Sequence, residues 1–335
     1  MDCDWRAFVS LVRACALPMA VVALSYPAHA QEPVPDTGFR PAEEQKRVEL
    51  PKQLKALARG STPLNPQKTV FVHVKKKRVY LETEVVCQNC VLEMFCVPRG
   101  QREHETVLNV DSKAAVVHAA LLAIGLKRGE PAVFFPDFKP PKGPRLTLKV
   151  HWVDKDGKVQ NADGRSWIRH SIYRYFSQPL DQAPPGVELP HDELRYDRVN
   201  KQLIWYGPMS NKQKTHLLTL WDDSAYQAAI EEFYKQSQSR PMTAEFVFAG
   251  SIWQTIEGTQ RRIYAAEDGH FITVANFAAS TIDIAEPSSA SDGGQLYEAW
   301  EERIPPEGTP VLLEIIPIDS EKKNPAESTV ESKSP

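Results

Sequence analysis

Residues 146–153 read Leu-Thr-Leu-Lys-Val-His-Trp-Val, with an apolar side chain at every second position from Leu146 to Trp152. A period of two puts alternate side chains on opposite faces of an extended chain, so this stretch predicts a β-strand with one buried face. Asp156-Gly157 follows and is typical of a tight hairpin turn that leads into residues 158–160. The stretch therefore indicates a sheet built largely from antiparallel strands.

Further strand candidates, rich in β-branched and aromatic residues, lie on both sides of this stretch. The segment 297–302 is expected to be either a helical turn or a strand end. The 27 prolines against 16 glycines favour extended connections and defined turns over a helical bundle. The other expected strands are 70–74, 78–86, 92–97, 244–249, 262–266, 271–276 and 311–316.

Two helices are predicted within residues 69–317. The first runs from 113 to about 126, with Asp111-Ser112 as its cap, and is apolar on every face, which is typical of a buried helix. The second, 226–236, has apolar residues at helical spacing on one side. The expected fold class is α+β: mainly antiparallel β with one buried helix and an inserted αβ segment.

Composition shifts along the chain predict its organisation. Residues 31–68 are proline-rich and are expected to be a linker with one short helix, and 69–317 are expected to form a single domain. Residues 179–240, which are rich in charged and aromatic side chains, are interpreted as an insertion into that domain. Residues 318–335 are almost devoid of apolar side chains and are expected to be disordered.

Residues 1–30 have the three parts of a secretory signal. Arg6 and Arg13 form a basic region, and Ala28-His29-Ala30 offers small residues to a signal peptidase. The apolar stretch between them, 14–24, is shorter than the ~18–20 residues that span a bilayer. We expect cleavage after Ala30, export to the periplasm or beyond the cell, and no transmembrane segment in the mature chain. A transmembrane anchor and a lipoprotein modified at Cys15 are the alternatives, and both fit the sequence less well.

The net charge and the sequence motifs narrow the classes of function that are expected. The net charge is −3, so the chain has no general attraction to nucleic acid, and no nucleic-acid partner is expected. The sequence contains no nucleophile elbow, no phosphate-binding glycine loop and no zinc-protease motif. These observations favour a non-catalytic protein over an enzyme.

Eight short stretches between residues 70 and 317 resemble, in order, one known family. The stretches are 78–82, 92–95, 103–108, 118–123, 166–169, 246–251, 272–277 and 302–311. Together they resemble the bacterial YdjY-like domain, found in exported proteins without an established activity. The resemblance carries over no catalytic residues. It implies one pair of cysteines, with one member before and one after residues 92–95, so Cys90 is the expected unpaired thiol. Relative to shorter members of the family, residues 179–240 are expected to be extra sequence.

The three cysteines outside the N-terminal signal, Cys87, Cys90 and Cys96, allow three kinds of chemistry. A metal such as zinc takes four ligands, and His104 and His118 are the candidates to complete such a set. A disulfide is the expected state in an oxidising compartment and leaves one thiol over. Redox catalysis at Cys87-Gln-Asn-Cys90 ranks last, because no helix is expected directly after the motif.

The histidines and the aromatic residues of the insertion can also be interpreted as structural residues. His118 lies within an apolar helix and is expected to be a neutral core histidine with one hydrogen bond. His104 lies between two glutamates in an expected loop or strand edge. The insertion contains three aromatic residues of the types that bind carbohydrate or another envelope protein: Trp205, Tyr206 and Trp221. The favoured interpretation is that they pack within the insertion.

The sequence therefore leads to two functional hypotheses. The first is an exported, non-catalytic binding or structural module of the cell envelope, without a cofactor. The alternative is a metal- or thiol-dependent redox protein that uses the three clustered cysteines. The sequence does not identify the ligand or the partner.

Overall fold

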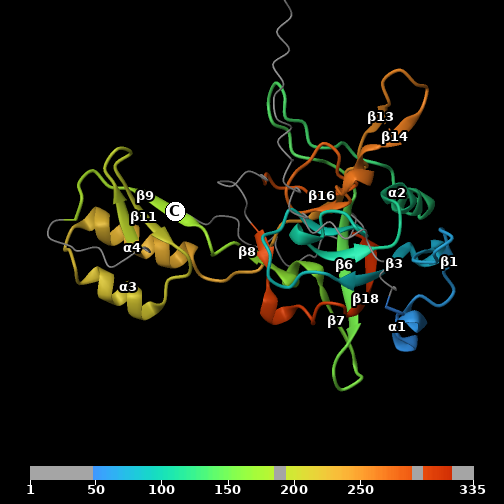
Figure 1. The fold of residues 1–335 in the computed structure, drawn as a ribbon, viewed down its shortest axis with the longest axis horizontal. Coiled ribbons are helices and arrows are strands. Elements are labelled where there is room, and N and C mark those ends of the chain that lie inside the picture. The colour runs from blue at the N-terminus through green and yellow to red at the C-terminus, as the bar shows by residue number, and fades with distance from the viewer. Residues whose placement is uncertain (1–47, 185–193, 289–296, 319–335) are drawn as a thin grey trace, which may run out of the picture. The chain divides into compact units, whose positions relative to one another are not determined.

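The computed structural model describes residues 48–184, 194–288 and 297–318. Within these ranges the chain is mostly β-strand with a few helices (Figure 1). The expected signal peptide and residues 319–335 of the expected tail lie outside them. The elements are α1(Lys52–Leu57), β1(Thr62–Pro63), β2(Val70–His73), β3(Arg78–Val85), β4(Met94–Pro98), β5(Thr106–Val110), α2(Ala114–Ala123), β6(Arg145–Val153), β7(Val159–Asp163), β8(Ile168–His170), β9(Tyr175–Pro179), β10(Leu194–Asp197), β11(Gln202–Tyr206), α3(Asn211–Leu218), α4(Ser224–Gln236), β12(Phe246–Phe248), β13(Trp253–Thr255), β14(Arg262–Tyr264), β15(Ile272–Thr273), β16(Ile282–Ile284), β17(Tyr297–Ala299) and β18(Pro310–Pro317).

Eight strands form a closed barrel in the order β3-β18-β6-β12-β16-β15-β4-β5, and β5 pairs with β3 to complete the ring. The closing register places Thr83 opposite Val110 and Val85 opposite Leu108. The neighbours β4–β5 and β15–β16 are parallel, and the other neighbours around the ring are antiparallel. Closure gives the ring strands hydrogen-bonding partners on both sides, which is how barrels avoid exposed strand edges.

The barrel interior is filled by alternate residues of its longest strands. In β6, Leu148 and Val150 are buried, and in β18, Leu313 and Ile315 are buried beside them in the same hydrophobic core. The strands are antiparallel with Leu313 opposite Val150, so these side chains share one face of the sheet. The alternation that predicts the strand from sequence therefore also determines which side chains fill the barrel.

Helix α1 covers part of the outer face of the barrel. Leu54 is completely buried and packs with Tyr80 of β3 and Leu312 of β18, which point away from the interior. Residues 48–68, expected to belong to a linker with one short helix, thus include that helix and pack against the barrel. The remainder of the expected linker, 31–47, lies outside the described residues.

Helix α2 differs from the expected buried helix in two respects. It is buried on one side only: Leu121 is fully buried, whereas Leu122 is 45% exposed and Ala119 is also exposed. Its first turn is not capped by Asp111 or Ser112. Instead, the backbone N–H groups of Ala114 and Ala115 donate to the Glu267 carboxylate at 3.1 and 3.0 Å. A carboxylate from elsewhere in the chain satisfies the free N–H groups that every helix start presents.

Residues 175–184 and 194–236 form a lobe with a hydrophobic core of its own. Strands β10, β11 and β9 make an antiparallel sheet, and α3 and α4 lie beside it (Figure 1). Ser210 and Gln213 form a reciprocal capping box at the start of α3. The predicted helix 226–236 is confirmed as the main part of α4. The core of the lobe contains Phe176, Leu203, Trp205, Met209, Leu217, Tyr226, Ile230 and Phe233.

The insertion aromatics named from sequence lie in different environments. Trp205 is buried and donates from Nε1 to the Gly207 carbonyl oxygen at 2.8 Å. Trp221 packs against Tyr226, with ring centroids 5.5 Å apart. Tyr206 is 41% exposed, and its ring lies 4.8 Å from that of Tyr175. The packing interpretation therefore holds for both tryptophans.

The β-rich part of the expected fold class is confirmed, but two strands of the ring are shorter than expected: β12 contains three residues and β15 contains two. The three-residue strand β16 is not among the predicted strands. β5 was also missed, although 103–108 was recognised as part of a family motif. Segment 297–302 contains both alternatives, the strand β17 followed by a short 3-10 turn at Glu301–Arg303. Among the described residues, no helix is long and apolar enough to cross a bilayer.

The one-sided burial of α2 makes a prediction about two adjacent leucines. Leu121→Ala should lower the free energy of unfolding by roughly 2–5 kcal/mol because it leaves a cavity in the barrel core. Leu122→Ala, the matched control, should change it by at most about 0.5 kcal/mol. Urea unfolding followed by circular dichroism measures both. Equal losses at the two positions would show that α2 is buried on both sides.

Candidate functional site

The directions of the strands determine which helices and loops lie at each of the two rims of the barrel. β5 is parallel to β4 and antiparallel to β3, so the ends of β4 and β5 lie at the same rim as the start of β3. α2 and residues 124–144 leave from that rim, and the β13–β14 hairpin follows the end of β12 there. Residues 87–93, which follow β3, lie at the opposite rim. We call the rim from which α2 leaves the α2 rim, and the rim with residues 87–93 the cysteine rim.

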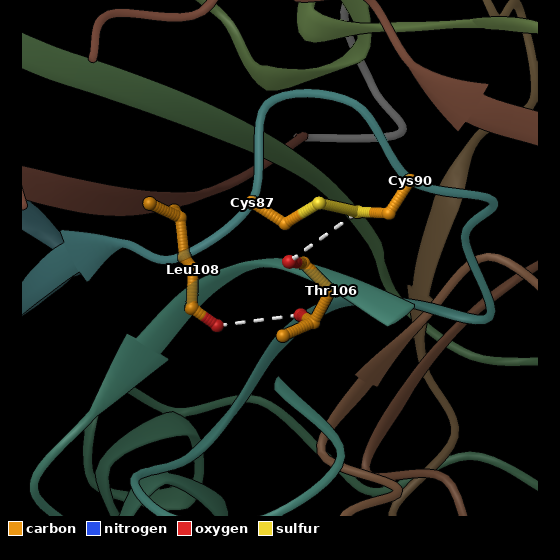
Figure 2. Close-up of a disulfide and its surroundings, with 4 residues drawn as sticks. All are labelled: Cys87, Cys90, Thr106 and Leu108. Carbon is orange, nitrogen blue, oxygen red and sulfur yellow. Dashed lines mark hydrogen bonds between the residues drawn. A yellow bond between two sulfur atoms is a disulfide. The ribbon is translucent and has the colours of Figure 1, made fainter. Parts of the chain in front are cut away.

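At the cysteine rim, Cys87 and Cys90 form a disulfide (Figure 2). Their Cα atoms are 6.3 Å apart, within the span that a bridge requires. The Cys90 sulfur lies 4.0 Å from the carbonyl oxygen of Thr106, the first residue of β5. The disulfide prediction is therefore confirmed, and it joins the two cysteines of the Cys-x-x-Cys motif.

The prediction that Cys90 is the unpaired thiol is wrong. Cys96 is the free cysteine, and it lies in β4 with its side chain buried in the barrel core. The loop after β3 brings Cys87 and Cys90 together, whereas the pleat of β4 directs Cys96 into the core. Burial raises the pKa of the Cys96 thiol far above its usual range. A neutral buried thiol is a poor nucleophile and a poor metal ligand.

Beside the disulfide is a small hollow of about 300 Å³, lined by Asn89, Cys90, Val91, Tyr173 and Glu298. The backbone there is fixed by β17, since the Ala299 N–H donates to the Cys90 carbonyl oxygen at 2.9 Å.

A buried ion pair borders this hollow. The Glu298 carboxylate accepts from Arg169 Nε at 2.6 Å, from Ser171 Oγ at 3.1 Å and from the Ile172 N–H at 3.3 Å. Arg169 and Glu298 are 7% and 6% exposed, so the pair is almost fully desolvated and is satisfied by hydrogen bonds. Arg169 belongs to the family motif 166–169, and its Nη1 also donates to Glu302 of the motif 302–311, at 3.4 Å. The two motifs are thus joined by one ionic cluster.

The residues proposed as a metal set are not brought together. Among the described residues, no group of three or more histidine, cysteine, aspartate or glutamate side chains is arranged to hold a metal ion. Cys87 and Cys90 are bonded to each other, Cys96 is in the core, and the His104 side chain is 81% exposed. His118 is hydrogen-bonded to Tyr264.

The Glu103-His104-Glu105 motif organises the connection between β4 and β5. Glu103 accepts from the Gly100 N–H at 2.9 Å and from Asn109 Nδ2 at 2.7 Å. Glu105 accepts from Arg102 Nη1 at 2.9 Å. Both carboxylates therefore hold the chain in place, and His104 between them points to solvent.

His118 belongs to a buried polar network below the α2 rim. Its Nδ1 lies 2.7 Å from the Tyr264 hydroxyl, which also accepts from Thr281 Oγ1 at 3.0 Å. Burial and the nearby charge of Arg128 lower the pKa of His118, so the imidazole is neutral near pH 7. Burial raises the pKa of Tyr264, which keeps its hydroxyl protonated and able to donate to His118. The predicted neutral histidine thus has its hydrogen-bond partner.

Tyr264 is also part of a cleft of about 980 Å³ at the α2 rim. Its walls come from the start of α2, from the β13–β14 hairpin and from the turn after β4. The lining includes Arg102, Lys113, Trp253, Arg261, Arg262, Tyr264, Glu267 and Asp268. The size is that of a small-molecule site.

The charges of the cleft are unevenly paired. Glu267 is engaged by the N–H groups of α2, and Asp268 lies 2.8 Å from His270 Nδ1. Lys113, Arg261 and Arg262, in contrast, form no ion pair with the described residues. The cleft therefore presents unpaired positive charge to a ligand.

The cleft also has an aromatic wall. Trp253 is 44% exposed, its ring lies 5.0 Å from that of Tyr264, and the Arg262 guanidinium carbon lies 5.7 Å from its centroid. Arg262 and Trp253 are thus placed to contact the same ligand, one through charge and the other through a flat apolar face.

A buried carboxyl lies in the barrel wall. Asp283 of β16 is fully buried and accepts from the Ile284 N–H at 2.8 Å, Thr273 Oγ1 at 3.0 Å and Asn276 Nδ2 at 3.1 Å. Burial raises the pKa of Asp283 to about 7, although these hydrogen bonds oppose the shift. Thr273 and Asn276 belong to the family motif 272–277, so part of that motif serves to hold Asp283.

Sequence reasoning missed most of the cleft. Trp253, Arg261, Arg262 and Glu267 lie outside every motif that resembled the family. The one available signal was the pair of adjacent arginines, Arg261-Arg262, at the start of the strand candidate 262–266. Asp283 gave no signal, because burial of a carboxylate depends on residues that are distant in sequence.

Comparison with known proteins gives one match. Residues 70–172 match the family model of the YdjY domain, which confirms the resemblance over the segment from β2 to just beyond β8. This segment includes the disulfide and α2, but not β12, β15, β16 or β18 of the ring. No curated protein and no solved structure matches the chain significantly.

The buried carboxyl of Asp283 predicts a pH dependence of stability. Its folded-state pKa, about 7, is above the value of ~3.9 expected in the unfolded chain, so between these values the folded protein keeps a proton that the unfolded chain has lost. The stabilising contribution is complete below about pH 4 and is lost as the pH rises through 7. Between these two pKa values the free energy of unfolding of the parent should fall by at most about 1.4 kcal/mol per pH unit, and Asp283→Asn should remove this decline. Urea unfolding between these pH values measures it, and parallel profiles for the two proteins would contradict the assignment.

Proposed function

We propose that this YdjY-domain protein is an exported, non-catalytic binding module of the cell envelope, and that its ligand occupies the cleft at the α2 rim. The observation that carries the proposal is the combination of unpaired cations and an exposed tryptophan in one cleft of about 980 Å³. Export is supported by the signal-like sequence of residues 1–30. Periplasmic or extracellular location agrees with the disulfide.

The cleft supports an anionic ligand that has a flat apolar part. Lys113, Arg261 and Arg262 supply positive charge, and arginine in particular pairs with carboxylate or phosphate through two hydrogen bonds. Trp253 supplies a face on which an aromatic ring or a sugar ring stacks. The two carboxylates of the cleft do not pair with these cations: Glu267 accepts from the N–H groups of α2, and Asp268 lies beside His270.

We also propose that residues 179–240 are an insertion into a YdjY-like domain that spans 69–317, giving a mainly antiparallel barrel with an αβ addition. The support is topological. β6 and β12 are neighbours in the ring, with Leu146 opposite Phe246, although more than ninety residues separate them in sequence. The lobe between them has its own core, so its removal leaves the pairing of the barrel strands intact.

A thiol redox function is the second candidate, and one observation favours it: Cys90 borders a hollow next to the buried Glu298. In such a reaction the reduced cysteines would form their disulfide while a substrate disulfide is reduced to two thiols. The structure offers less support for reactivity, because a loop follows Cys90, whereas reactive Cys-x-x-Cys motifs lie at the start of a helix.

The ligand proposal is tested with two fluorescent probes that share one aromatic skeleton. Anilinonaphthalene sulfonate is anionic, and N-phenylnaphthylamine is its neutral counterpart. Arg261→Ala/Arg262→Ala should weaken binding of the anion by at least about tenfold, which corresponds to ~1.4 kcal/mol, and should affect the neutral probe much less. The control, Arg195→Ala/Arg198→Ala in the lobe, should alter neither. If both probes bind the cleft variant as they bind the parent, the cleft is not an anion site.

The role of the disulfide is tested by thiol counting together with a redox assay. We expect Cys87→Ser/Cys90→Ser to lower the free energy of unfolding by roughly 2 kcal/mol or less, since the bridge closes a loop of only four residues. The reduced parent protein should not accelerate the reduction of insulin by dithiothreitol. Cys96 should react with a thiol reagent only after unfolding. Acceleration that is lost in the double variant would instead establish the redox function.

A further inference from the structure

A hairpin at the α2 rim carries the most exposed aromatic side chain of the described residues. Residues 130–142 fold back on themselves through paired backbone hydrogen bonds between Glu130 and Lys142 and between Val133 and Lys139. Phe135 at the turn is 87% exposed, and Phe134 is 54% exposed. Val133 and Phe138 are 43% and 40% exposed, so four large apolar side chains gather on one short tip.

The base of this hairpin is built for close packing. A Cβ atom on Gly129 would lie 1.8 Å from the Lys142 carbonyl oxygen, and one on Gly143 would lie 2.3 Å from the Phe248 carbonyl oxygen. The Gly129 N–H donates to that Phe248 oxygen at 3.0 Å. Two glycines therefore allow the hairpin to attach tightly to β12 of the barrel. The aromatic tip is held on a fixed base, and not on an unsupported loop.

Cations outnumber anions along the hairpin: Lys139 pairs with Val133 next to the apolar tip, and Lys142 pairs with Glu130 at the base. Lys127, Arg128, Lys139 and Lys142 are all exposed, and only Glu130 and Asp137 are anionic within residues 127–142. None of these charged side chains forms an ion pair with the described residues. The hairpin thus combines protruding phenylalanines with a net positive charge.

We propose that this hairpin docks the protein onto an anionic phospholipid surface, with Phe134 and Phe135 inserted between the headgroups. A bilayer interface takes up apolar side chains of this kind at the boundary between its headgroups and acyl chains. Burial of one phenylalanine side chain changes a partition coefficient by roughly tenfold to a hundredfold. Lys139 beside the tip and the lysines and arginine at the base of the hairpin are attracted to anionic headgroups, while their own apolar stems stay near the interface.

The proposal is independent of the ligand in the cleft. It concerns residues 127–142, none of which lines that cleft, and it requires no particular ligand. It places the α2 rim toward the lipid, so the β13–β14 hairpin at the same rim also faces the membrane.

The test is sedimentation of the full chain with vesicles of phosphatidylcholine containing roughly one-third phosphatidylglycerol, and with vesicles of phosphatidylcholine alone. The parent should bind the anionic vesicles more tightly, and less so at high salt. Phe134→Ser/Phe135→Ser should reduce binding at least about tenfold. Lys139→Glu/Lys142→Glu should reduce binding to the anionic vesicles to the level seen with phosphatidylcholine alone.

The matched control is Tyr175→Ser/Val199→Ser, which removes two apolar side chains that are 60% and 90% exposed in the lobe. It should bind as the parent does, and all variants should unfold at the same temperature because every altered side chain is at the surface. Equal binding by the parent and the phenylalanine variant overturns the proposal, as does no binding by the parent. A lipid-free dimer that is lost in Phe134→Ser/Phe135→Ser, without vesicle binding, would show that the hairpin docks a second copy of the chain.

Discussion

Pairing of β5 with β3 is the contact on which the rest of the structure depends. Strand β3 uses one edge twice: residues 78–81 pair with β2, and residues 83–85 pair with β5. Its other edge pairs with β18 along most of its length. This double use converts an open sheet into a ring and fixes which loops share a rim. The disulfide loop is thereby placed at one end, and α2 with two hairpins at the other.

The two rims carry different chemistry. At the cysteine rim, a short disulfide closes the loop after β3, and the buried Arg169–Glu298 pair ties the YdjY-domain segment to β17, which comes from far along the chain. These groups are satisfied by one another, as in a structural element. At the α2 rim, Lys113, Arg261, Arg262 and Phe135 lack such partners among the described residues, as in a surface that meets other molecules. The functional proposals therefore concern the α2 rim.

Sequence patterns predicted the long strands and the amphipathic helix because each of these is encoded by its own periodicity. β6, with Leu148 and Val150 facing the core, and α4 are examples. The patterns could not predict β16 or the burial of Asp283, since three residues have no measurable period and their burial depends on Thr273 and Asn276. Tertiary context also decided how much of α2 is covered and which cysteines are bonded. The cleft was missed because its residues come from separate segments that only ring closure brings to one rim.

Closure of the ring is tested most directly by native-state amide hydrogen exchange. The Val86 N–H, which donates to the Val107 carbonyl oxygen at 2.9 Å, reports on the β3–β5 seam. If the barrel is closed as described, this amide and those of β5 that face β3 will exchange only through global unfolding, with the same free energy as the amides between β18 and β6. Exchange at the seam through a separate opening of much lower free energy, while β18 and β6 stay protected, would show that the barrel is an open sheet.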